Sequence, residues 1–548
     1  RDAQESRGLG DVYKRQAHVA VQGYLKLAAQ GRYDEALALI KRENPLPAIC
    51  GRVCNRRCED ACTRGRVDAA VAIDEVKKFI AQRDLDAATR YVPPVVTPTR
   101  AGGFDQKIAI IGAGPAGLSC AFYLAEKGYK PVVFEKNERP GGMLTYGIPS
   151  FKLQKDVIEA EVEVIRLMGA EFRYGVEVGR DVTLDELRAQ GFKAFYVAIG
   201  CQGGRLAGIP GEDAEDVTVA VDFLREVNSG KIDSLPGRTI VVGGGNVAID
   251  VARNACRLGS EHVEMFCLES EAQMPASEEE RREAIEDGVH ISCGWGPKEV
   301  HLDEAGHVRG ITFKRCTRVF DDEGRFAPEY DENDLRRVDA DRVVMSIGQS
   351  IVWGDLLAGS KVELGRGQGA LADPRTYQTA EPDIFVGGDV YTGPSFAIDA
   401  IAAGHEAAVS IHRFVQPGST LTIGRNQRRY TALDRDDVVI ESYDNASREV
   451  AHVDREREKA APFSEYVETF TEEQVRAETA RCLGCGASIV DPNKCIGCGL
   501  CTTKCAFDAI HLDRDRPECS TMVKYEQKLP SLGKYALKRA IKIKFGRK

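Results

Sequence analysis

The sequence lacks the features that mark membrane-spanning, secreted and nucleic-acid-binding proteins. No apolar run approaches the roughly 20 residues that a membrane-spanning helix needs. No charged segment followed by an apolar one resembles a secretory signal, and the formal net charge is -10 rather than basic. We therefore expect a cytoplasmic protein with no membrane span and no nucleic-acid partner. Its length of 548 residues indicates about three to four globular domains.

Cysteine, by contrast, is plentiful and unevenly placed. Of the 17 cysteines, four fall in residues 50–62 and seven in residues 482–519. In a secreted chain such groups would indicate disulfides. In a large chain without a secretory signal, and with the nucleotide-binding motifs described next, metal ligation is the better interpretation.

A glycine-rich fingerprint follows the first apolar strand pattern of the chain. The stretch KIAIIGAGPAGLSCAFYLAEKG contains Gly112, Gly114 and Gly117 in the order G-x-G-x-x-G, between a strand pattern and a helix pattern. Glycines in this context let the backbone approach a pyrophosphate at a helix N-terminus. The next strand pattern, PVVFEK, carries Glu135, whose carboxylate can accept hydrogen bonds from both hydroxyls of a ribose. Together these residues predict a dinucleotide site.

The stretch TAEPDIFVGGDVYTGPSFAIDAIAAG, residues 379–404, indicates which dinucleotide binds there. Gly388 and Asp389 end an apolar strand pattern, and the helix pattern after them begins with small residues. This stretch resembles the second FAD motif of flavoproteins that have two dinucleotide-binding domains. The resemblance implies that the aspartate binds the ribityl chain and that the helix N-terminus faces the isoalloxazine ring. The helix dipole would then stabilise negative charge on the reduced flavin.

A second fingerprint, GRTIVVGGGNVAIDVARNACRLG, places Gly243, Gly245 and Ala248 in the variant order G-x-G-x-x-A. Because it lies inside the FAD-binding region, we expect it to bind a nicotinamide nucleotide. The alternatives are a second flavin or a degenerate site. Cys120 has no cysteine partner nearby in the sequence, which argues against a disulfide reductase and favours a small buried residue.

The stretch VEMFCLESEAQMPAS, residues 263–277, bears on the choice of donor. In NADPH-using members of the flavoproteins that this chain resembles, two adjacent arginines follow this strand and bind the 2′-phosphate. Here the two positions are Leu268 and Glu269. A carboxylate repels a phosphate and accepts hydrogen bonds from a free 2′-hydroxyl, so we expect NAD(H) to be preferred over NADP(H). The alternative is a glutamate that merely faces solvent.

The C-terminal cysteines have the spacing of iron–sulfur ligands. The run C-x2-C-x2-C-x3-C is the ferredoxin spacing for a [4Fe–4S] cluster, although Ala506 replaces the usual proline. Taken alone, the spacing Cys482-x2-Cys485-x9-Cys495-x2-Cys498 could instead be that of a zinc ribbon. Cys482, Cys485 and Cys519 could complete a second cluster, and the spacing does not settle which cysteine serves which cluster. The expected ligands are Cys482, Cys485, Cys495, Cys498, Cys501 and Cys505.

The N-terminal cysteines Cys50, Cys54, Cys58 and Cys62 recur every four residues. On one continuous helix this spacing would give a buried stripe. Because the four residues are cysteines among arginines and acids, we favour metal ligation instead.

Several motifs resemble the small subunit of glutamate synthase and the N-terminal half of dihydropyrimidine dehydrogenase. They are NPLPAICGRVCNRRCEDAC, GAGPAGL, RPGGMLTYGIPSFKL, GIPGED, VVGGGNVAIDVAR and MPAS. The resemblance implies a helical Fe–S domain followed by FAD and NAD(P)H domains, with Gly142 among the FAD-binding residues. The tail resembles that of FAD-dependent oxidoreductases with an added C-terminal cluster domain. Family members also carry cysteines upstream, where residues 1–16 have none. We expect residues 1–16 to be non-native and the N-terminal cluster region to be short of ligands.

The expected fold class is α/β, with two nested Rossmann-like dinucleotide-binding domains for FAD and NAD(P)H. A helical Fe–S domain precedes them and a small ferredoxin-like Fe–S domain follows. The expected parts are a non-native segment 1–16, the helical domain 17–90, a linker 91–104, the FAD domain 105–235 and 348–415, the NAD(P)H domain 236–347, a connecting segment 416–475, the ferredoxin-like domain 476–520 and a basic tail 521–548.

These features predict an electron-input flavoprotein. NADH would reduce FAD, and [4Fe–4S] clusters would pass single electrons to a protein acceptor, either ferredoxin-like or a catalytic large subunit. The alternative is a glutamate synthase small subunit that supplies a glutamine-dependent large subunit. A third hypothesis, a wiring subunit with vestigial nucleotide sites, conflicts with the intact glycines of both fingerprints. The basic tail could dock an acidic acceptor or could simply be a solvated amphipathic end.

Overall fold

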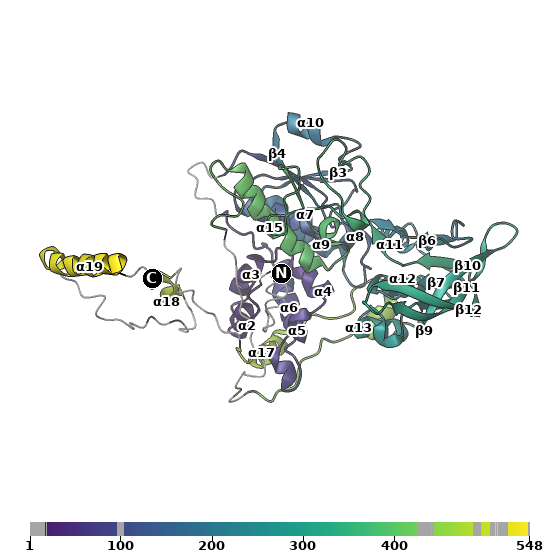
Figure 1. Cartoon of the computed structure of the whole chain (residues 1–548). Helices are drawn as coiled ribbons and strands as arrows, with labels where there is room; N and C mark the ends of the chain where they lie inside the picture. Colours follow the sequence, from purple (N-terminus) through teal and green to yellow (C-terminus); the bar gives the residue numbers. More distant parts are fainter. Residues whose placement is uncertain are drawn as a thin grey trace. The chain divides into compact units, whose positions relative to one another are not determined.

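The computed structural model describes residues 17, 19–95, 103–425, 440, 443–485, 495–504, 510, 512 and 524–545. The chain divides into two compact units, and the boundary between them follows Gly486. Figure 1 gives the labels of the helices and strands. Residues 1–16 lie outside the described part, so the expectation that they are non-native stays a prediction.

The larger unit begins with a group of short helices. Their bounds are α2 Val21–Ala29, α3 Tyr33–Lys41, α4 Pro47–Val53, α5 Arg57–Asp60, the 3-10 helix η1 Thr63–Arg66, and α6 Ile73–Leu85. Apolar residues at helical spacing bury one face of each longer helix, and α4 starts with proline, which suits the first helical position. Helix α17 (Glu472–Ala480) packs against α2 and α6, although it lies far downstream in the sequence.

The first nucleotide-binding domain is built on a five-stranded parallel sheet in the order β15-β4-β1-β2-β3. The strands are β1 Lys107–Ile111, β2 Val132–Glu135, β3 Glu171–Tyr174, β4 Phe192–Val197 and β15 Ile384–Val386. The helices are α7 Pro115–Glu126, α8 Met143–Tyr146, α9 Lys155–Leu167, α10 Leu184–Ala189, α14 Asp389–Thr392 and α15 Ala397–Val415. Helices α7 and α15 pack closely, because a Cβ at Gly404 would lie 2.2 Å from the carbonyl oxygen of Ala116.

The second nucleotide-binding domain repeats this plan with the parallel sheet β6-β13-β7-β8-β9. Its strands are β6 Val217–Val219, β7 Arg238–Val242, β8 His262–Cys267, β9 His290–Cys293 and β13 Arg342–Met345. Its helices are α11 Ala220–Asn228, α12 Asn246–Arg257 and α13 Glu278–Glu286, with the 3-10 helix η2 Glu271–Gln273. All five strands lie between β4 and β15 in the sequence, so the nested arrangement expected from the sequence is confirmed.

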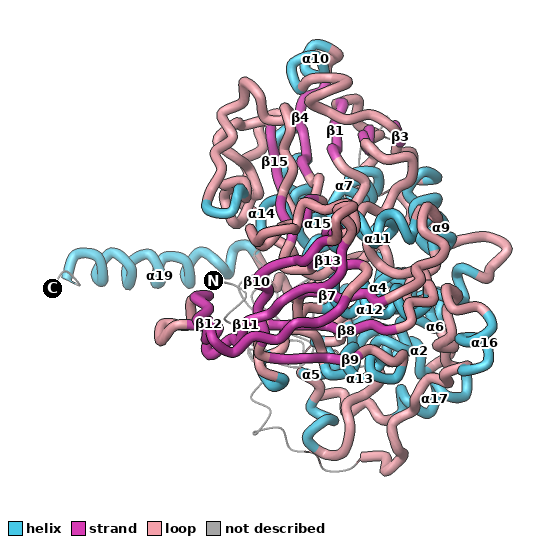
Figure 2. Tube along the Cα trace, turned by 90° about the vertical axis from the view of Figure 1, so that its right-hand side faces the viewer, coloured by secondary structure: helices cyan, strands magenta, loops and turns pink. Residues whose placement is uncertain are grey.

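Two smaller sheets complete this domain and its connection to the first. An antiparallel sheet comprises β10 Trp295–Leu302, β11 Val308–Phe320 and β12 Phe326–Asp339 (Figure 2). A two-stranded ladder pairs β5 (Gly203–Gly204) with β14 (Gln349–Ser350), and these strands belong to the two connections between the nucleotide-binding domains. The two connections therefore lie side by side.

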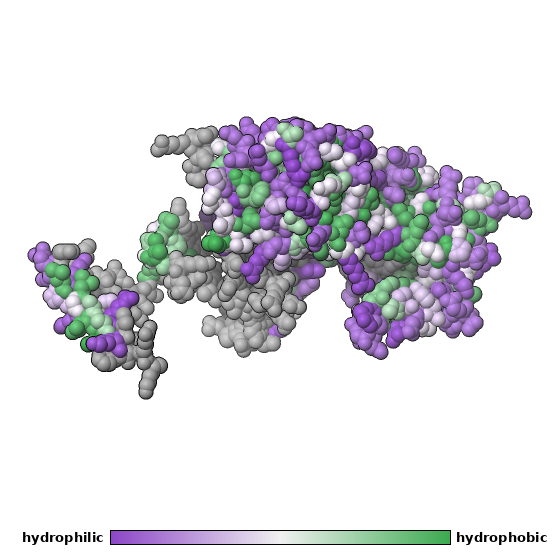
Figure 3. All heavy atoms as spheres, turned by 45° about the horizontal axis from the view of Figure 1, so that its top comes forward, coloured by the Kyte–Doolittle hydropathy of each residue, from purple (hydrophilic) through white to green (hydrophobic). Residues whose placement is uncertain are grey.

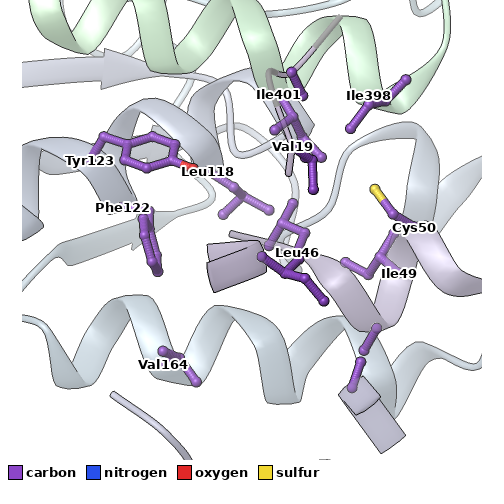
Figure 4. Close-up of a cluster of buried hydrophobic side chains, with 14 of the residues drawn as sticks. Val19, Leu46, Ile49, Cys50, Leu118, Phe122, Tyr123, Val164, Ile398 and Ile401 are labelled. Atoms are coloured by element: carbon purple, nitrogen blue, oxygen red, sulfur yellow. The ribbon is translucent and has the colours of Figure 1, made fainter. Parts of the chain in front are cut away.

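One hydrophobic core joins the N-terminal helices to the first nucleotide-binding domain. Figure 4 shows Leu46, Ile49 and Cys50 packed near Leu118 and Ile401, from helices α7 and α15. The visible face of the larger unit is mostly hydrophilic (Figure 3). Among the described residues, every helix is too short or too polar to cross a bilayer.

The smaller unit has two described helices, α18 (Leu500–Lys504) and α19 (Tyr525–Phe545). Exposed apolar side chains on α19 include Leu529, Leu532 and Leu537. The helix also carries lysines and an arginine, so it presents both apolar and basic side chains.

Candidate functional site

The glycines of the first fingerprint are required by the backbone of the turn after β1. Gly112 has a φ of 104°, and a Cβ there would lie 2.5 Å from the carbonyl oxygen of Ala198. A Cβ at Gly117 would lie 1.9 Å from the carbonyl oxygen of Gly112. Gly114 is the N-cap of α7, which has no side-chain cap, and the space beside its α-carbon is open. Uncapped amides at a helix N-terminus are suited to a pyrophosphate.

Glu135 is the last residue of β2 and is 3% exposed. Its Oε2 accepts a hydrogen bond from the amide of Ala113 at 2.8 Å, and its Oε1 accepts from the amide and side chain of Asn137 at 2.9 and 2.6 Å. The carboxylate is thus tied to the fingerprint loop, a role that its spacing alone does not reveal. A carboxylate oxygen has two lone pairs, so Oε2 can still accept a ribose hydroxyl.

The expected flavin end of the site lies where β15 leads into α14 and α15. Gly388 has a φ of 66°, and Oδ1 of Asp389 accepts a hydrogen bond from the amide of Ser395 at 3.2 Å. Burial raises the pKa of the Asp389 carboxyl to about 6. Phe396 is the N-cap of α15 and gives it no side-chain hydrogen bond, so the positive end of a 19-residue helix is free for a ligand. Gly142 approaches the fingerprint, since its Cβ would lie 3.1 Å from the α-carbon of Gly114.

A single large cavity, of about 1010 Å³, connects these elements. Six predicted FAD-binding residues line it: Gly112, Gly114, Glu135, Gly142, Gly388 and Asp389. The first turns of α12 (Asn246, Val247 and Asp250) also line it, and so does Cys54 from the N-terminal region. The dinucleotide site, the start of the second nucleotide domain and one cysteine of the first cluster motif therefore share one space. Gly117 lies inside the turn rather than on the cavity wall.

The second fingerprint has the same backbone constraints as the first. Gly243 has a φ of 144°, and a Cβ there would lie 2.3 Å from the carbonyl oxygen of Ser346. Gly245 caps α12 without a side-chain hydrogen bond and faces open space. Ala248 is fully buried where α12 packs on the sheet. A nucleotide pyrophosphate is suited to this helix start as well.

Glu269 lies against the second fingerprint. A Cβ at Gly244 would be 3.0 Å from Oε2 of Glu269, so the carboxylate touches the loop rather than pointing away from it. The carbonyl of Glu269 accepts a hydrogen bond from the amide of Gly294 at 3.0 Å, which fixes its backbone. Leu268 turns toward β10, since its Cδ2 would lie 2.9 Å from a Cβ at Gly296.

Lys152 lines the cavity and links the two nucleotide-binding domains, and the sequence analysis did not predict this role. Its ammonium group pairs with Asp250 at 2.6 Å and also with Glu280, which joins the first domain to α12 and α13 of the second. Burial raises the pKa of Asp250 to about 6, and Lys152 opposes that rise. A lysine among apolar residues in GIPSFKL indicates a buried charge that needs a partner. The sequence does not identify that partner, because Asp250 lies about 100 residues away.

The N-terminal cysteines do not form a stripe on one helix. Helix α4 ends at Val53, the backbone of Cys54 is extended, and a new helix starts at Arg57. Cys50, Cys58 and Cys62 are buried, and burial raises the pKa of the Cys50 thiol to about 12. Cys50 packs in the hydrophobic core (Figure 4). In the part of the chain that the structure describes, no three His, Cys, Asp or Glu side chains are arranged to hold a metal ion.

The C-terminal cysteines divide between the two units. Cys482 and Cys485 are half-buried in the larger unit, because that unit extends to Gly486. Cys495, Cys498 and Cys501 belong to the smaller unit and are exposed, and Cys505 lies outside the described residues. Ligation of iron by any of these cysteines stays a prediction.

Comparison with known families matches three parts of the chain. Residues 106–404 match the family "Pyridine nucleotide-disulphide oxidoreductase". Residues 13–89 match dihydropyrimidine dehydrogenase domain II, 4Fe-4S cluster, and residues 488–511 match a 4Fe-4S binding domain. These matches confirm the resemblance found in the sequence, and the chain therefore contains both FAD-binding and [4Fe–4S] domains.

Curated relatives are similar over most of the chain. The NADP(+)-dependent formate dehydrogenase subunit beta of Moorella thermoacetica is 35% identical over 86% of this chain and 69% of its own length. The glutamate synthase [NADPH] small chain of Escherichia coli K12 is 35% identical over 74% of this chain and 88% of its own length. The NAD-dependent dihydropyrimidine dehydrogenase subunit PreT of Escherichia coli O157:H7 is 33% identical over 70% of this chain and 85% of its own. The chain belongs to the pyridine nucleotide-disulphide oxidoreductase family, as an FAD-dependent NAD(P)H oxidoreductase with iron–sulfur domains.

Proposed function

We propose that this chain takes hydride from NADH onto FAD and passes single electrons through [4Fe–4S] clusters to a partner protein. One observation carries the proposal: the fingerprint of the first domain, the start of α12 and Cys54 line the same cavity. Bound FAD supplies the chemistry, because flavin accepts electrons in a pair and releases them singly. The cavity gives such a group one neighbour that delivers electron pairs and another that takes single electrons.

The residues of the chain act by position rather than by proton transfer. The uncapped N-termini of α7 and α12 would each hold a pyrophosphate. Asp389 would accept a hydrogen bond from the ribityl chain, and the N-terminus of α15 would stabilise negative charge at the ring. Lys152 would keep the second nucleotide domain against the first. Holding two rings in contact is sufficient for hydride transfer.

The preference for NADH rests on Glu269. Its carboxylate lies against Gly244, at the end of β8, where the adenosine ribose of a nucleotide would lie. A carboxylate there accepts hydrogen bonds from a free 2′-hydroxyl and repels a 2′-phosphate. The names of the relatives include both donors, NADP in the formate dehydrogenase subunit and NAD in PreT.

The acceptor is proposed to be a protein, either ferredoxin-like or a catalytic large subunit. Three relatives are named as subunits or a small chain, which fits a chain that works with a partner. The alternative is a glutamate synthase small subunit, favoured by the E. coli small chain. A glutamine-dependent large subunit that co-purifies with the chain from its host would support this alternative, and an unrelated partner would exclude it.

The proposed function is tested by anaerobic reduction with NADH. We expect the flavin absorbance to bleach after NADH is mixed with the protein, and the EPR signal of a reduced iron–sulfur cluster to appear afterwards. Cys54→Ser should leave flavin bleaching unchanged and lower the reduction of cytochrome c, a generic one-electron protein acceptor, at least tenfold. The matched control is Cys256→Ser, a half-buried cysteine of α12 that does not line the cavity. Bleaching without any reduction of iron would exclude the proposed electron path.

A further inference from the structure

Three cysteines from opposite ends of the sequence meet in one hollow of the larger unit. Cys62, Cys482 and Cys485 line a small hollow beside the apolar side chains of Val21, Leu25 and Ile73. The expectation from sequence grouped Cys482 and Cys485 with the ferredoxin-like tail because they are close to it in the chain. In the structure they instead face the cysteine that ends the N-terminal motif.

The segment that carries Cys482 is fixed to the N-terminal region by hydrogen bonds and by an ion pair between the buried Arg481 and the partly exposed Asp68. Arg481 is 1% exposed, and its guanidinium pairs with Glu478 at 2.6 Å and with Asp68 at 3.0 Å. The carbonyl of Arg481 accepts a hydrogen bond from Arg64 at 3.1 Å. Oε1 of Glu478 also accepts from the amide of Ala72 at 2.7 Å. Buried charges are tolerated when each has such partners, so this docking is specific.

The surroundings of the three thiols suit a cysteine-ligated metal group. Apolar side chains line much of the hollow, and Arg64 lines it as well. A guanidinium there stabilises the negative charge that thiolate ligands bring to a cluster. The hydroxyl of Thr63 is buried beside Cys485, where it is placed to donate to a ligand sulfur.

The family comparison distinguishes between the metal groups. The range that matches dihydropyrimidine dehydrogenase domain II, 4Fe-4S cluster, contains Cys62. The potential metal ligands that line the hollow are all cysteines, a ligand set that [4Fe–4S] clusters use.

We propose that Cys62, Cys482 and Cys485 ligate one [4Fe–4S] cluster, separate from the cluster of the ferredoxin-like tail. The proposal deepens the proposed function, because it gives the clusters of that function a defined ligand set. Three thiolates fill three of the four ligand positions. Residues 472–485 then complete the N-terminal cluster domain, although Cys482 follows Cys62 by 420 residues (482 − 62) in the sequence.

The test uses the full chain reduced with dithionite, so that it does not depend on NADH or on the flavin. We expect Cys62→Ser and Cys482→Ser to remove the same EPR component and the same amount of iron and sulfide, about one cluster per chain. The double variant should lose no more than either single variant, because all three cysteines serve one group. Cys498→Ser should remove a different component, and Cys120→Ser, a lone buried thiol, should remove none.

Three results would overturn the proposal. The first is that Cys482→Ser removes the same EPR component as Cys498→Ser. The second is that Cys482→Ser removes an EPR component that Cys62→Ser leaves intact. Stoichiometric zinc in place of iron is the third. If a serine variant does not fold, the unmodified protein still gives an answer. After chelation of iron, a short thiol-to-thiol cross-linker should join Cys62 to Cys482 or Cys485, as read by peptide mass. Cross-links only between Cys482 or Cys485 and the cysteines of residues 495–505 would exclude the proposed site.

Discussion

Changing Leu268 and Glu269 together to arginine should move the donor preference from NADH toward NADPH. The unmodified protein should use NADH with a kcat/KM at least about tenfold higher, which is about 1.4 kcal/mol. The structure supports this magnitude because the carboxylate of Glu269 touches Gly244 of the fingerprint loop. At a separation of about 5 Å in water, each charge of a 2′-phosphate costs about 0.8 kcal/mol beside a carboxylate. A phosphate with nearly two charges therefore accounts for the tenfold preference before any lost hydrogen bond is counted.

The assay measures kcat/KM for both nucleotides anaerobically, with a dye as acceptor so that the clusters are not required. Glu269→Gln removes the charge and keeps the shape of the side chain. It should lower the ratio of kcat/KM for NADH to kcat/KM for NADPH, mainly by raising kcat/KM for NADPH. Glu304→Arg, an exposed glutamate of the turn between β10 and β11, changes the net charge as much as Glu269→Arg and should leave the ratio unchanged. Equal kcat/KM values in the unmodified protein, or a Glu269→Gln variant with an unchanged ratio, would refute the role of Glu269.

Three further predictions concern the clusters, the flavin site and the tail. Cys498→Ser should abolish transfer to a one-electron protein acceptor while NADH still bleaches the flavin; zinc at these cysteines with no EPR signal would contradict this. Burial raises the pKa of Asp389 from 3.8 to about 6, so folding takes up a proton between about pH 4 and pH 6. The contribution of Asp389 to stability therefore falls as the pH rises through this range. Asp389→Asn should therefore stabilise the FAD-free protein by up to about 3 kcal/mol at pH 7.5 and not at pH 4 in denaturant titrations, and an equal gain at both pH values would count against it. Deleting residues 534–548 should slow acceptor turnover at low salt and have little effect at high salt, and no change at low salt would leave the tail without a docking role.

The parts of the site that the sequence predicts well are those fixed by local backbone geometry. The turns after β1 and β7 admit glycine alone at Gly112 and Gly243, because a side chain there would strike the carbonyl of the residue that follows a neighbouring strand. Such a constraint appears at fixed spacing in the sequence, so both fingerprints and the nested fold could be inferred from it. The sequence likewise predicts a flavin-binding role for Asp389 from a strand that ends in a glycine pair, and this role stays a prediction.

The contacts that the sequence hides are those between distant charged residues. Arg481 is buried and pairs with Asp68, which lies 413 residues earlier in the sequence. A buried ion pair leaves no periodic apolar signal, and its partners can lie anywhere in the chain. For the same reason Lys152 could not be paired with Asp250, and Cys482 was grouped with its neighbours in sequence rather than with Cys62.

The ladder of β5 and β14 makes the second nucleotide-binding domain a cassette. The chain enters and leaves that domain through two adjacent strands, Gly203–Gly204 and Gln349–Ser350. These two strands pair as an antiparallel ladder. An engineer could therefore cut at these two points and exchange the whole donor-binding module for that of an NADP-dependent relative. In such a chimaera the cavity would keep its other walls and would exchange those that this module contributes from α11, α12 and α13.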